Sequence, residues 1–324
     1  MSLPRTRLSA VAAATTLALT LAACSGQGDG SGTSGAPTES ERPPAASSLA
    51  SAPKDVPDPV ADAAVDGPER ADSPEQVVEQ IVAAERAVQD PATGRKGLAA
   101  AGHLQQVAYR VLANRPGWDR AVRRALPARL RPVVRRNVAS RREFRSMHHE
   151  LSDELPAWRI VQPAPARELL AHYRLAERRF GVNWEYLAAI NLVESGMGRI
   201  RGTSVAGAKG PMQFIPETWE RYGRGDIESP RDAILAAARY LAASGFDEPG
   251  GIPDALHSYN NHNAYVRGVT HLATVMEERP RAFFGYYHWQ VYYLTQEGDV
   301  LLPVGYEQSD PVPVERWLED NPRE

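Results

Sequence analysis

The stretch AAINLVESGM at 188–197, followed by GAKGPMQF at 207–214, determines what the rest of the chain must support. Apolar residues at three- and four-residue spacing predict a helix that begins after Asn183 and ends just beyond Glu194. A glycine-rich loop follows and re-enters a helix at Pro216. The sequence therefore places a carboxylate at a helix end, beside a loop whose glycines allow close backbone approach to a ligand.

Glu194 has a sequence environment that disfavours its ionised form. Leu192 and Val193 precede it and Met197 follows it, so burial is expected, and the C-terminal end of a helix carries partial negative charge. Both effects raise the pKa of a carboxyl group. A carboxylic acid that stays protonated near neutral pH is what glycosidic bond cleavage needs as its general acid. From position alone, an ordinary surface glutamate at a helix end is the competing interpretation.

Composition limits the classes of function. The chain has 324 residues, 43% of them hydrophobic and 24% charged, as in a globular protein of one or two domains. Its net charge is −3, and removing residues 1–23, with two arginines and no acid, leaves −5, so no nucleic-acid binding is expected. A single cysteine allows no internal disulfide. His257, His262 and His271 lack metal-ligand spacing, so we expect no metal and no cofactor.

The N-terminus has the features of an export signal. Arg5 and Arg7 precede an apolar run over 8–21, and the run ends in LAAC at 21–24. We interpret 1–23 as a signal peptide and Cys24 as the lipidated first residue of a bacterial lipoprotein, anchored to the outer face of the cell membrane. A plain secretory signal with an incidental cysteine is the alternative.

Two regions separate this signal from the motif-bearing part of the chain. Residues 24–72 are rich in Gly, Ser, Pro and Ala, which predicts a disordered tether. Residues 73–162 are predicted to be a helical region that begins at an N-cap, Ser73, followed by Pro74. Its later part is expected to contain short helices over 118–125, 127–137 and 139–150.

Arginines are concentrated in this helical region. Residues 110–145 contain twelve arginines and two acids, Asp119 and Glu143. Solvated helix faces are the simpler interpretation. The alternative is a patch that contacts anionic wall polymers or the carboxylates of peptidoglycan stem peptides.

Three short motifs occur in order along the chain: ES at 194–195, GPMQF at 210–214 and SYN at 258–260. Together they resemble the signature of the lytic transglycosylases of the lysozyme-like superfamily, and GAKGPMQFIPETW at 207–219 resembles the exported type. The resemblance covers about 170–280. Many members have Leu where Pro211 stands and Ala where Ser258 stands; neither position holds the acid.

The resemblance implies a mainly α fold of the α+β lysozyme-like kind, with the transglycosylase domain over 163–283 and peptidoglycan glycan strands as the partner. Glu194 would protonate the oxygen of the β-1,4 bond between N-acetylmuramic acid and N-acetylglucosamine. As a carboxylate it would then take the proton of the muramoyl C6 hydroxyl, which attacks C1 and leaves a 1,6-anhydro end. Nothing in the sequence indicates an oligomeric state.

The resemblance also implies roles for residues around the acid. Ser195 shapes the site, and the loop residues Met212 and Gln213 line the saccharide subsites. Gly210 lets the backbone approach the sugar. Tyr259 corresponds to the tyrosine whose hydroxyl bonds the catalytic carboxyl, and Asn260 to a residue that contacts sugar or braces the loop.

Residues 284–324 differ in kind from the helical parts. Aromatic and branched residues over 289–295 and 300–306 flank a short Gly-containing turn, which predicts a β-hairpin. Tyr286, Tyr287, Trp289 and Tyr292 could add a sugar-binding platform.

Two other functions remain open from the sequence. A hydrolytic lysozyme would need a second carboxylate, for which Asp226 and Asp254 are the candidates. A non-catalytic wall-binding module would need only the cleft.

Overall fold

The computed structural model describes residues 67–204 and 206–321, and it is mainly α-helical, as predicted. The N-terminal helices are α1 (Pro74–Gln89), α2 (Arg95–Ala113), η1 (Pro116–Trp118), α3 (Asp119–Ala125), η2 (Ala128–Leu130) and α4 (Arg131–Ser146). The later helices are α5 (Ala166–Phe180), α6 (Trp184–Ser195), α7 (Pro216–Tyr222), α8 (Pro230–Ala243), α9 (Ile252–Tyr259), α10 (Asn263–Glu278), α11 (Ala282–Tyr287) and α12 (Val314–Asp320).

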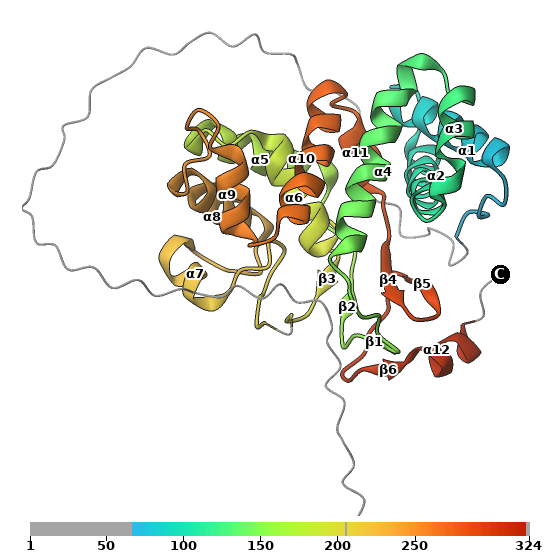
Figure 1. The fold of residues 1–324 in the computed structure, drawn as a ribbon. Helices are drawn as coiled ribbons and strands as arrows, with labels where there is room; N and C mark the ends of the chain where they lie inside the picture. Colours follow the sequence, from blue (N-terminus) through green and yellow to red (C-terminus); the bar gives the residue numbers. More distant parts are fainter. Residues whose placement is uncertain (1–66, 205, 322–324) are drawn as a thin grey trace, which may run out of the picture.

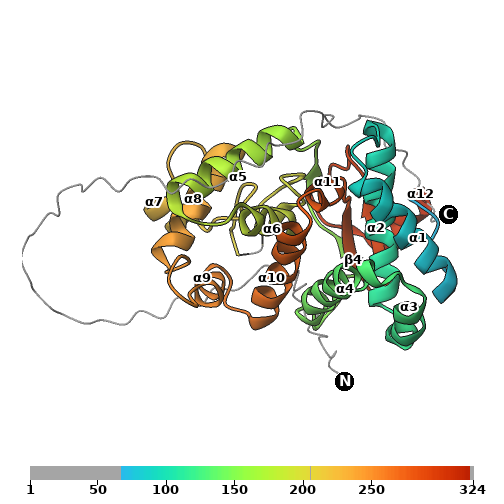
Figure 2. The same ribbon diagram turned by 90° about the horizontal axis from the view of Figure 1, so that it is seen from above.

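The helices form two groups that meet at α4 and α10. In Figures 1 and 2, α1–α3 lie on one side and α5–α9 on the other, with α4 and α10 side by side between them. Helix α6, which carries Glu194, packs on α10 and on α5. A single hydrophobic core runs from α1 to α11, so the N-terminal helices support the part of the chain that bears the motifs.

In the described residues, six short strands form three two-stranded antiparallel sheets. Strand β1 (Glu154–Leu155) pairs with β6 (Val312–Pro313), and β2 (Arg159–Ile160) pairs with β3 (Ile200–Arg201). The predicted hairpin is confirmed as β4 (Val291–Thr295) and β5 (Gly298–Leu302), whose register pairs Thr295 with Gly298 across a two-residue turn. A smaller hydrophobic cluster links β1, β2 and the hairpin to α12.

Local sequence signals explain most helix ends. The Ser73 hydroxyl accepts a hydrogen bond from the Gln76 amide at the start of α1, and Ser229 caps α8 in the same way. Gly181 ends α5 in the left-handed conformation that favours glycine.

One predicted helix boundary was wrong, and two predicted region boundaries lie within packed parts of the structure. Helix α4 begins at Arg131 with Pro132 in its first turn, where a missing amide costs nothing, and it continues to Ser146 without the break that we expected near 138. The predicted boundary at 283/284 falls inside α11, whose aromatic side chains belong to the common core. Ala71, assigned to the tether, is buried, and its carbonyl accepts a hydrogen bond from Arg115.

The predicted signal peptide, Cys24 and the tether up to residue 66 lie outside the described residues. Within the described part of the chain, none of the helices combines the length and the apolar character that a bilayer span requires.

Candidate active site

A cavity of about 550 Å³ lies where the two helix groups and the β4–β5 hairpin meet. Its wall includes residues from α2, α4, α6, α10, β4 and the loop between β3 and α7. Glu194 lines it, with Leu192 and Val193 from the same helix. The cavity is therefore shared by the motif-bearing helices and the N-terminal helices.

Within the described part of the chain, one side-chain hydrogen bond holds Glu194 in this cavity. The Tyr265 hydroxyl, on α10, donates to Glu194 Oε1 at 2.7 Å. Burial raises the pKa of Glu194 from 4.5 to about 7, and the Tyr265 hydrogen bond opposes that rise without cancelling it. The raised pKa predicted from the sequence is thus confirmed, with burial as its main cause. Near neutral pH the group can both give and take a proton.

The loop after the acid is closed and fixed by a few hydrogen bonds. Lys209 and Phe214 exchange both backbone hydrogen bonds at 2.9 Å, which closes the turn between them. The Ser195 hydroxyl donates to the Pro211 carbonyl, and the Tyr259 hydroxyl donates to the Met212 carbonyl at 2.6 Å. The residue after the acid and the tyrosine of the third motif therefore both fix the position of this loop.

Gln213, Tyr259 and Asn260, which the sequence assigned to the saccharide site, line the same cavity as Glu194. Ser195 and Met212 are fully buried and lie outside that wall. Gly210 also lies outside it.

Gly210 serves another purpose than the one we expected. Its φ is +73°, and a Cβ there would lie 2.1 Å from the Ile227 carbonyl oxygen. The residue allows close approach of protein backbone, and the structure places protein where we had expected sugar.

The predicted hydrogen bond from Tyr259 to the catalytic carboxyl was wrong. That hydroxyl bonds Met212, and Tyr265 takes the expected place at Glu194. Tyr265 is buried on the apolar face of α10, and a buried tyrosine hydroxyl usually has a hydrogen-bond partner. That pattern was the available signal, but its partner is set by the packing of α10 on α6.

Two polar side chains beside Glu194 are arranged for a ligand. Asn260 is buried, and its Nδ2 has no hydrogen-bond partner among the described residues although it lies at the cavity. Gln213 has a φ of +48°, a conformation that non-glycine residues rarely adopt, and its side-chain amide donates to the Gly210 carbonyl at 3.0 Å. Both groups could bind the hydroxyl or acetamido groups of a sugar.

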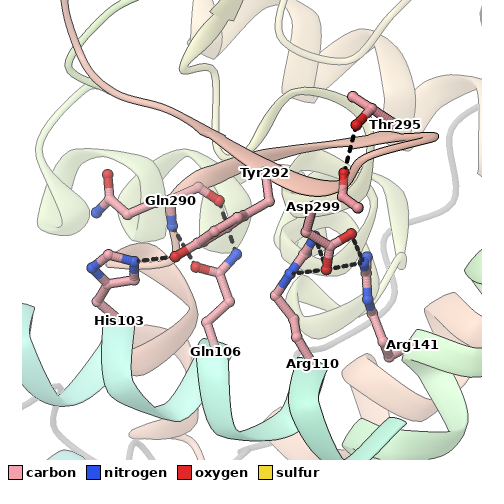
Figure 3. Close-up of polar contacts among 9 residues, drawn as sticks. His103, Gln106, Arg110, Arg141, Gln290, Tyr292, Thr295 and Asp299 are labelled. Atoms are coloured by element: carbon pink, nitrogen blue, oxygen red, sulfur yellow. Dashed lines mark hydrogen bonds and ion pairs between the residues drawn. The ribbon is translucent and has the colours of Figure 1, made fainter. Parts of the chain in front are cut away.

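The cavity reaches a second polar cluster, on α2, α4 and the hairpin (Figure 3). Arg110 binds Asp299 through Nε at 2.9 Å and Nη2 at 2.7 Å, and Arg141 Nη2 lies 3.4 Å from both carboxylate oxygens. The Arg110 guanidinium also stacks 4.4 Å from the centre of the Tyr292 ring. This network attaches the hairpin to the helices, and the sequence did not indicate it.

The remaining sequence candidates are distributed unevenly. Trp289 and Tyr292 line the cavity, whereas Tyr286 and Tyr287 are fully buried and offer no sugar-binding surface. Asp226 and Asp254, proposed as a second carboxylate, lie outside the cavity wall. Of the described acids, the wall contains Glu194 and Glu150. No cluster of three or more potential metal-ligand side chains occurs in the described ranges.

Comparison with known proteins agrees with this geometry. The family described as Transglycosylase SLT domain matches residues 172–274, which include Glu194, the loop and Tyr265. Residues 172–274 are a transglycosylase SLT domain. The match begins within α5 and ends within α10, so the Arg110–Asp299 cluster lies outside the SLT domain.

Two curated relatives share parts of the chain. Membrane-bound lytic murein transglycosylase F of Thiobacillus denitrificans is 33% identical over 183 residues, which is 54% of this chain and 38% of the relative. The protein of the same name from Nitrosospira multiformis is 30% identical over 127 residues, 39% of this chain and 26% of the relative. The matched segments thus span well under half the length of these relatives. No solved structure gives a significant match.

Proposed function

We propose that the protein is a lytic transglycosylase that cleaves the β-1,4 bond between N-acetylmuramic acid and N-acetylglucosamine in peptidoglycan. The observation that carries the proposal is Glu194, a carboxyl group in the SLT domain cavity whose burial raises its pKa to about 7. The SLT domain match and the names of the two relatives support the reaction class.

One carboxyl group is enough for the proposed reaction. Protonated Glu194 donates its proton to the glycosidic oxygen as the C1–O bond breaks. The resulting carboxylate accepts the proton of the muramoyl C6 hydroxyl, whose oxygen bonds to C1 and closes a 1,6-anhydro ring. Water is not consumed, and the internal nucleophile gains effective molarity over solvent. Tyr265 keeps the carboxyl oriented through its 2.7 Å hydrogen bond.

Product analysis tests the proposal directly. Purified protein is incubated with peptidoglycan, and the released muropeptides are identified by mass spectrometry. We expect 1,6-anhydromuramoyl ends from the wild type and none from Glu194→Gln, which keeps the shape of the side chain but cannot transfer its proton. Reducing ends without anhydro products would instead establish a hydrolytic muramidase.

Asp226→Asn and Asp254→Asn are matched controls, because each removes a carboxylate outside the cavity wall. Both should retain wild-type product yield. If neither the wild type nor these variants released product while glycan strands still bound, a non-catalytic wall-binding module would replace the enzyme.

We further propose that the protein acts in the cell envelope, anchored through a lipid on Cys24. The LAAC sequence at 21–24 and the membrane-bound relatives support this location. Palmitate labelling of the wild type and of Cys24→Ala checks it: label should enter only the wild type. Equal labelling of both would contradict the anchor.

A further inference from the structure

The Arg-rich stretch of the sequence contributes directly to the cavity of Glu194. Arg110, Arg141 and Arg145 line the cavity, whereas most of the other arginines in 110–145 lie on exposed helix faces. Arg141 and Arg145 occupy one face of α4, three positions before and one position after Phe144. The N-terminal helices thus give the cavity a basic end that is separate from the SLT domain.

This basic end has more positive charge than its own acids neutralise. Asp299 is the carboxylate shared by Arg110 and Arg141, and Glu150 is the other acid at this end. Three guanidinium groups therefore face two carboxylates. His148 adds no charge at neutral pH, because burial and then the nearby Arg141 lower its pKa to about 4. Among the described residues at this end of the cavity, the positive charges therefore exceed the negative ones by one.

Hydrogen-bonding capacity is also left over. The Nε of Arg141 is buried and has no hydrogen-bond partner among the described residues. Arg145 Nη1 lies 3.4 Å from the His148 carbonyl oxygen, a long hydrogen bond, and Arg145 is only half-buried. Guanidinium groups bind carboxylates through paired, charge-assisted hydrogen bonds, so such donors favour an incoming carboxylate.

The basic end lies close enough to Glu194 for one ligand to reach both. The Phe144 ring packs edge-on against Tyr265, 6.3 Å between ring centres, and Tyr265 bonds Glu194. Arg141 lies three positions before Phe144 and four before Arg145 on α4, so its Cβ is about 5–6 Å from the Cβ atoms of both. An extended peptide of four residues reaches roughly 13 Å. A short peptide on a sugar bound at Glu194 can therefore place a carboxylate among these arginines.

We propose that the basic end of the cavity, at Arg141 and Arg145, binds a free carboxylate of the stem peptide carried by the glycan strand at Glu194. This inference rests on the proposed function, because it takes peptidoglycan as the substrate. The site would make the protein select strands whose stem peptides are present and carry free carboxylates.

Continuity of the cavity favours a stem peptide over a phosphate-rich wall polymer. A stem peptide is covalently attached to the muramoyl residue, so binding of the sugar brings its carboxylates to the basic end at high effective concentration. A separate polymer has no link to the sugar and would compete with the glycan strand for the same space.

The test compares three glycan substrates on the intact protein: strands with free stem carboxylates, strands whose stem carboxylates are amidated, and strands with the peptides removed. Amidation removes the charge and keeps the size of the peptide. For the wild type we expect KM about tenfold lower for free-carboxylate strands than for amidated strands, as one charged hydrogen-bonded contact provides. Similar KM values for the two would overturn the proposal without any mutation.

Arg145→Gln locates the effect. It should raise KM about tenfold for free-carboxylate strands and leave KM unchanged for amidated and peptide-free strands. Arg145→Lys keeps the charge and should retain part of the preference. Arg135→Gln is the matched control, because Arg135 lies on the same helix, is exposed and is absent from the cavity wall. An equal loss on all three substrates would assign Arg145 to structure or glycan binding and overturn the proposal.

Binding measurements separate this inference from the proposed reaction. If the wild type cleaves no strand, the reaction fails, and calorimetric titration with a stem-bearing disaccharide decides the inference. Tighter binding of the free-carboxylate form than of the amidated form, lost in Arg145→Gln, would support it, and equal binding would refute it. If poly(glycerol phosphate) binding depends on Arg145 while stem binding does not, a phosphate polymer is the ligand and the proposal is overturned.

Discussion

Glu194 on the cavity wall and Asp299 in the arginine cluster that the cavity reaches are two carboxyl groups at low solvent exposure, and their pKa values move in opposite directions. Burial raises the pKa of Glu194 to about 7, opposed only by a hydrogen bond from Tyr265. Burial alone would also raise the pKa of Asp299, but the guanidinium groups of Arg110 and Arg141 outweigh it and hold that pKa below its usual value. The side chains that contact each carboxyl group, rather than its burial, therefore decide whether its pKa is raised or lowered.

The two carboxyl groups therefore serve different purposes: Glu194 is suited to proton transfer, and Asp299 stabilises the fold. A carboxyl group paired with a phenol keeps a proton that it can exchange near neutral pH. A carboxylate paired with two arginines stays ionised and attaches the hairpin to α2 and α4 (Figure 3). The SLT domain supplies the first group, and the second lies outside the matched segment. Changing either partner should therefore alter a different property of the protein.

The largest effect is expected from Asp299→Asn, which leaves Arg110 and Arg141 without their shared counterion. Arg110 is nearly buried, so the loss should destabilise the protein by about 3–5 kcal/mol, measured by urea unfolding at pH 7. Since the folded pKa of Asp299 lies below its ordinary value of 3.8, the deficit should persist as pH falls to about 4 and shrink only below it. Exposed Asp310→Asn is the control and should leave stability unchanged.

Glu194→Gln should change stability at neutral and alkaline pH, whereas the effect of Asp299→Asn changes only in acid. In the unfolded chain Glu194 ionises near 4.5, and in the folded protein it holds its proton to about pH 7. Its contribution is therefore complete below 4.5 and is lost as pH rises through 7. Relative to wild type, Glu194→Gln should gain about 2 kcal/mol between pH 4 and pH 8, less than full burial would give because the group is only part-buried. A constant difference across that range would show that Glu194 ionises normally.

Local sequence features predicted the elements that depend on nearby residues. The helix that carries Glu194 was predicted close to its observed bounds, Trp184–Ser195, because its apolar spacing and the Asn183 before it lie within a few positions. The hairpin was predicted from its turn. The raised pKa of Glu194 was also predicted, from the apolar residues beside it in the sequence.

Contacts between distant segments could not be predicted in this way. Tyr265 reaches Glu194 across 71 positions, and Arg141 reaches Asp299 across 158. The first depends on how α10 packs on α6, and the second on where the hairpin lies against α4. The resemblance to the family motif assigned the hydrogen bond to Glu194 to Tyr259, a residue of the third motif. In the structure the Tyr259 hydroxyl donates to the Met212 carbonyl of the loop instead.

Tyr265→Phe is expected to alter catalysis more than folding. The ring still packs against Phe144, but Glu194 loses its orienting hydrogen bond, so kcat should fall about tenfold. That hydrogen bond lowers the pKa of Glu194, so its removal raises the pKa further. The alkaline limb of the pH–rate profile should therefore move to higher pH. A shift to lower pH would show that Tyr265 does not stabilise the ionised form.

Tyr259→Phe should have the smallest effect, and in contrast to Tyr265→Phe it should alter stability more than catalysis. Its hydroxyl donates to the Met212 carbonyl, so the variant loses one buried hydrogen bond and about 1 kcal/mol of stability. Because Tyr265 still holds Glu194, the alkaline limb of the pH–rate profile should stay where it is in the wild type. Thermal unfolding and the pH–rate profile, measured beside Tyr265→Phe, separate the two tyrosines. A matching alkaline shift in both variants would mean that both tyrosines act on Glu194. It would contradict the assignment of Tyr259 to the loop and of Tyr265 to the acid.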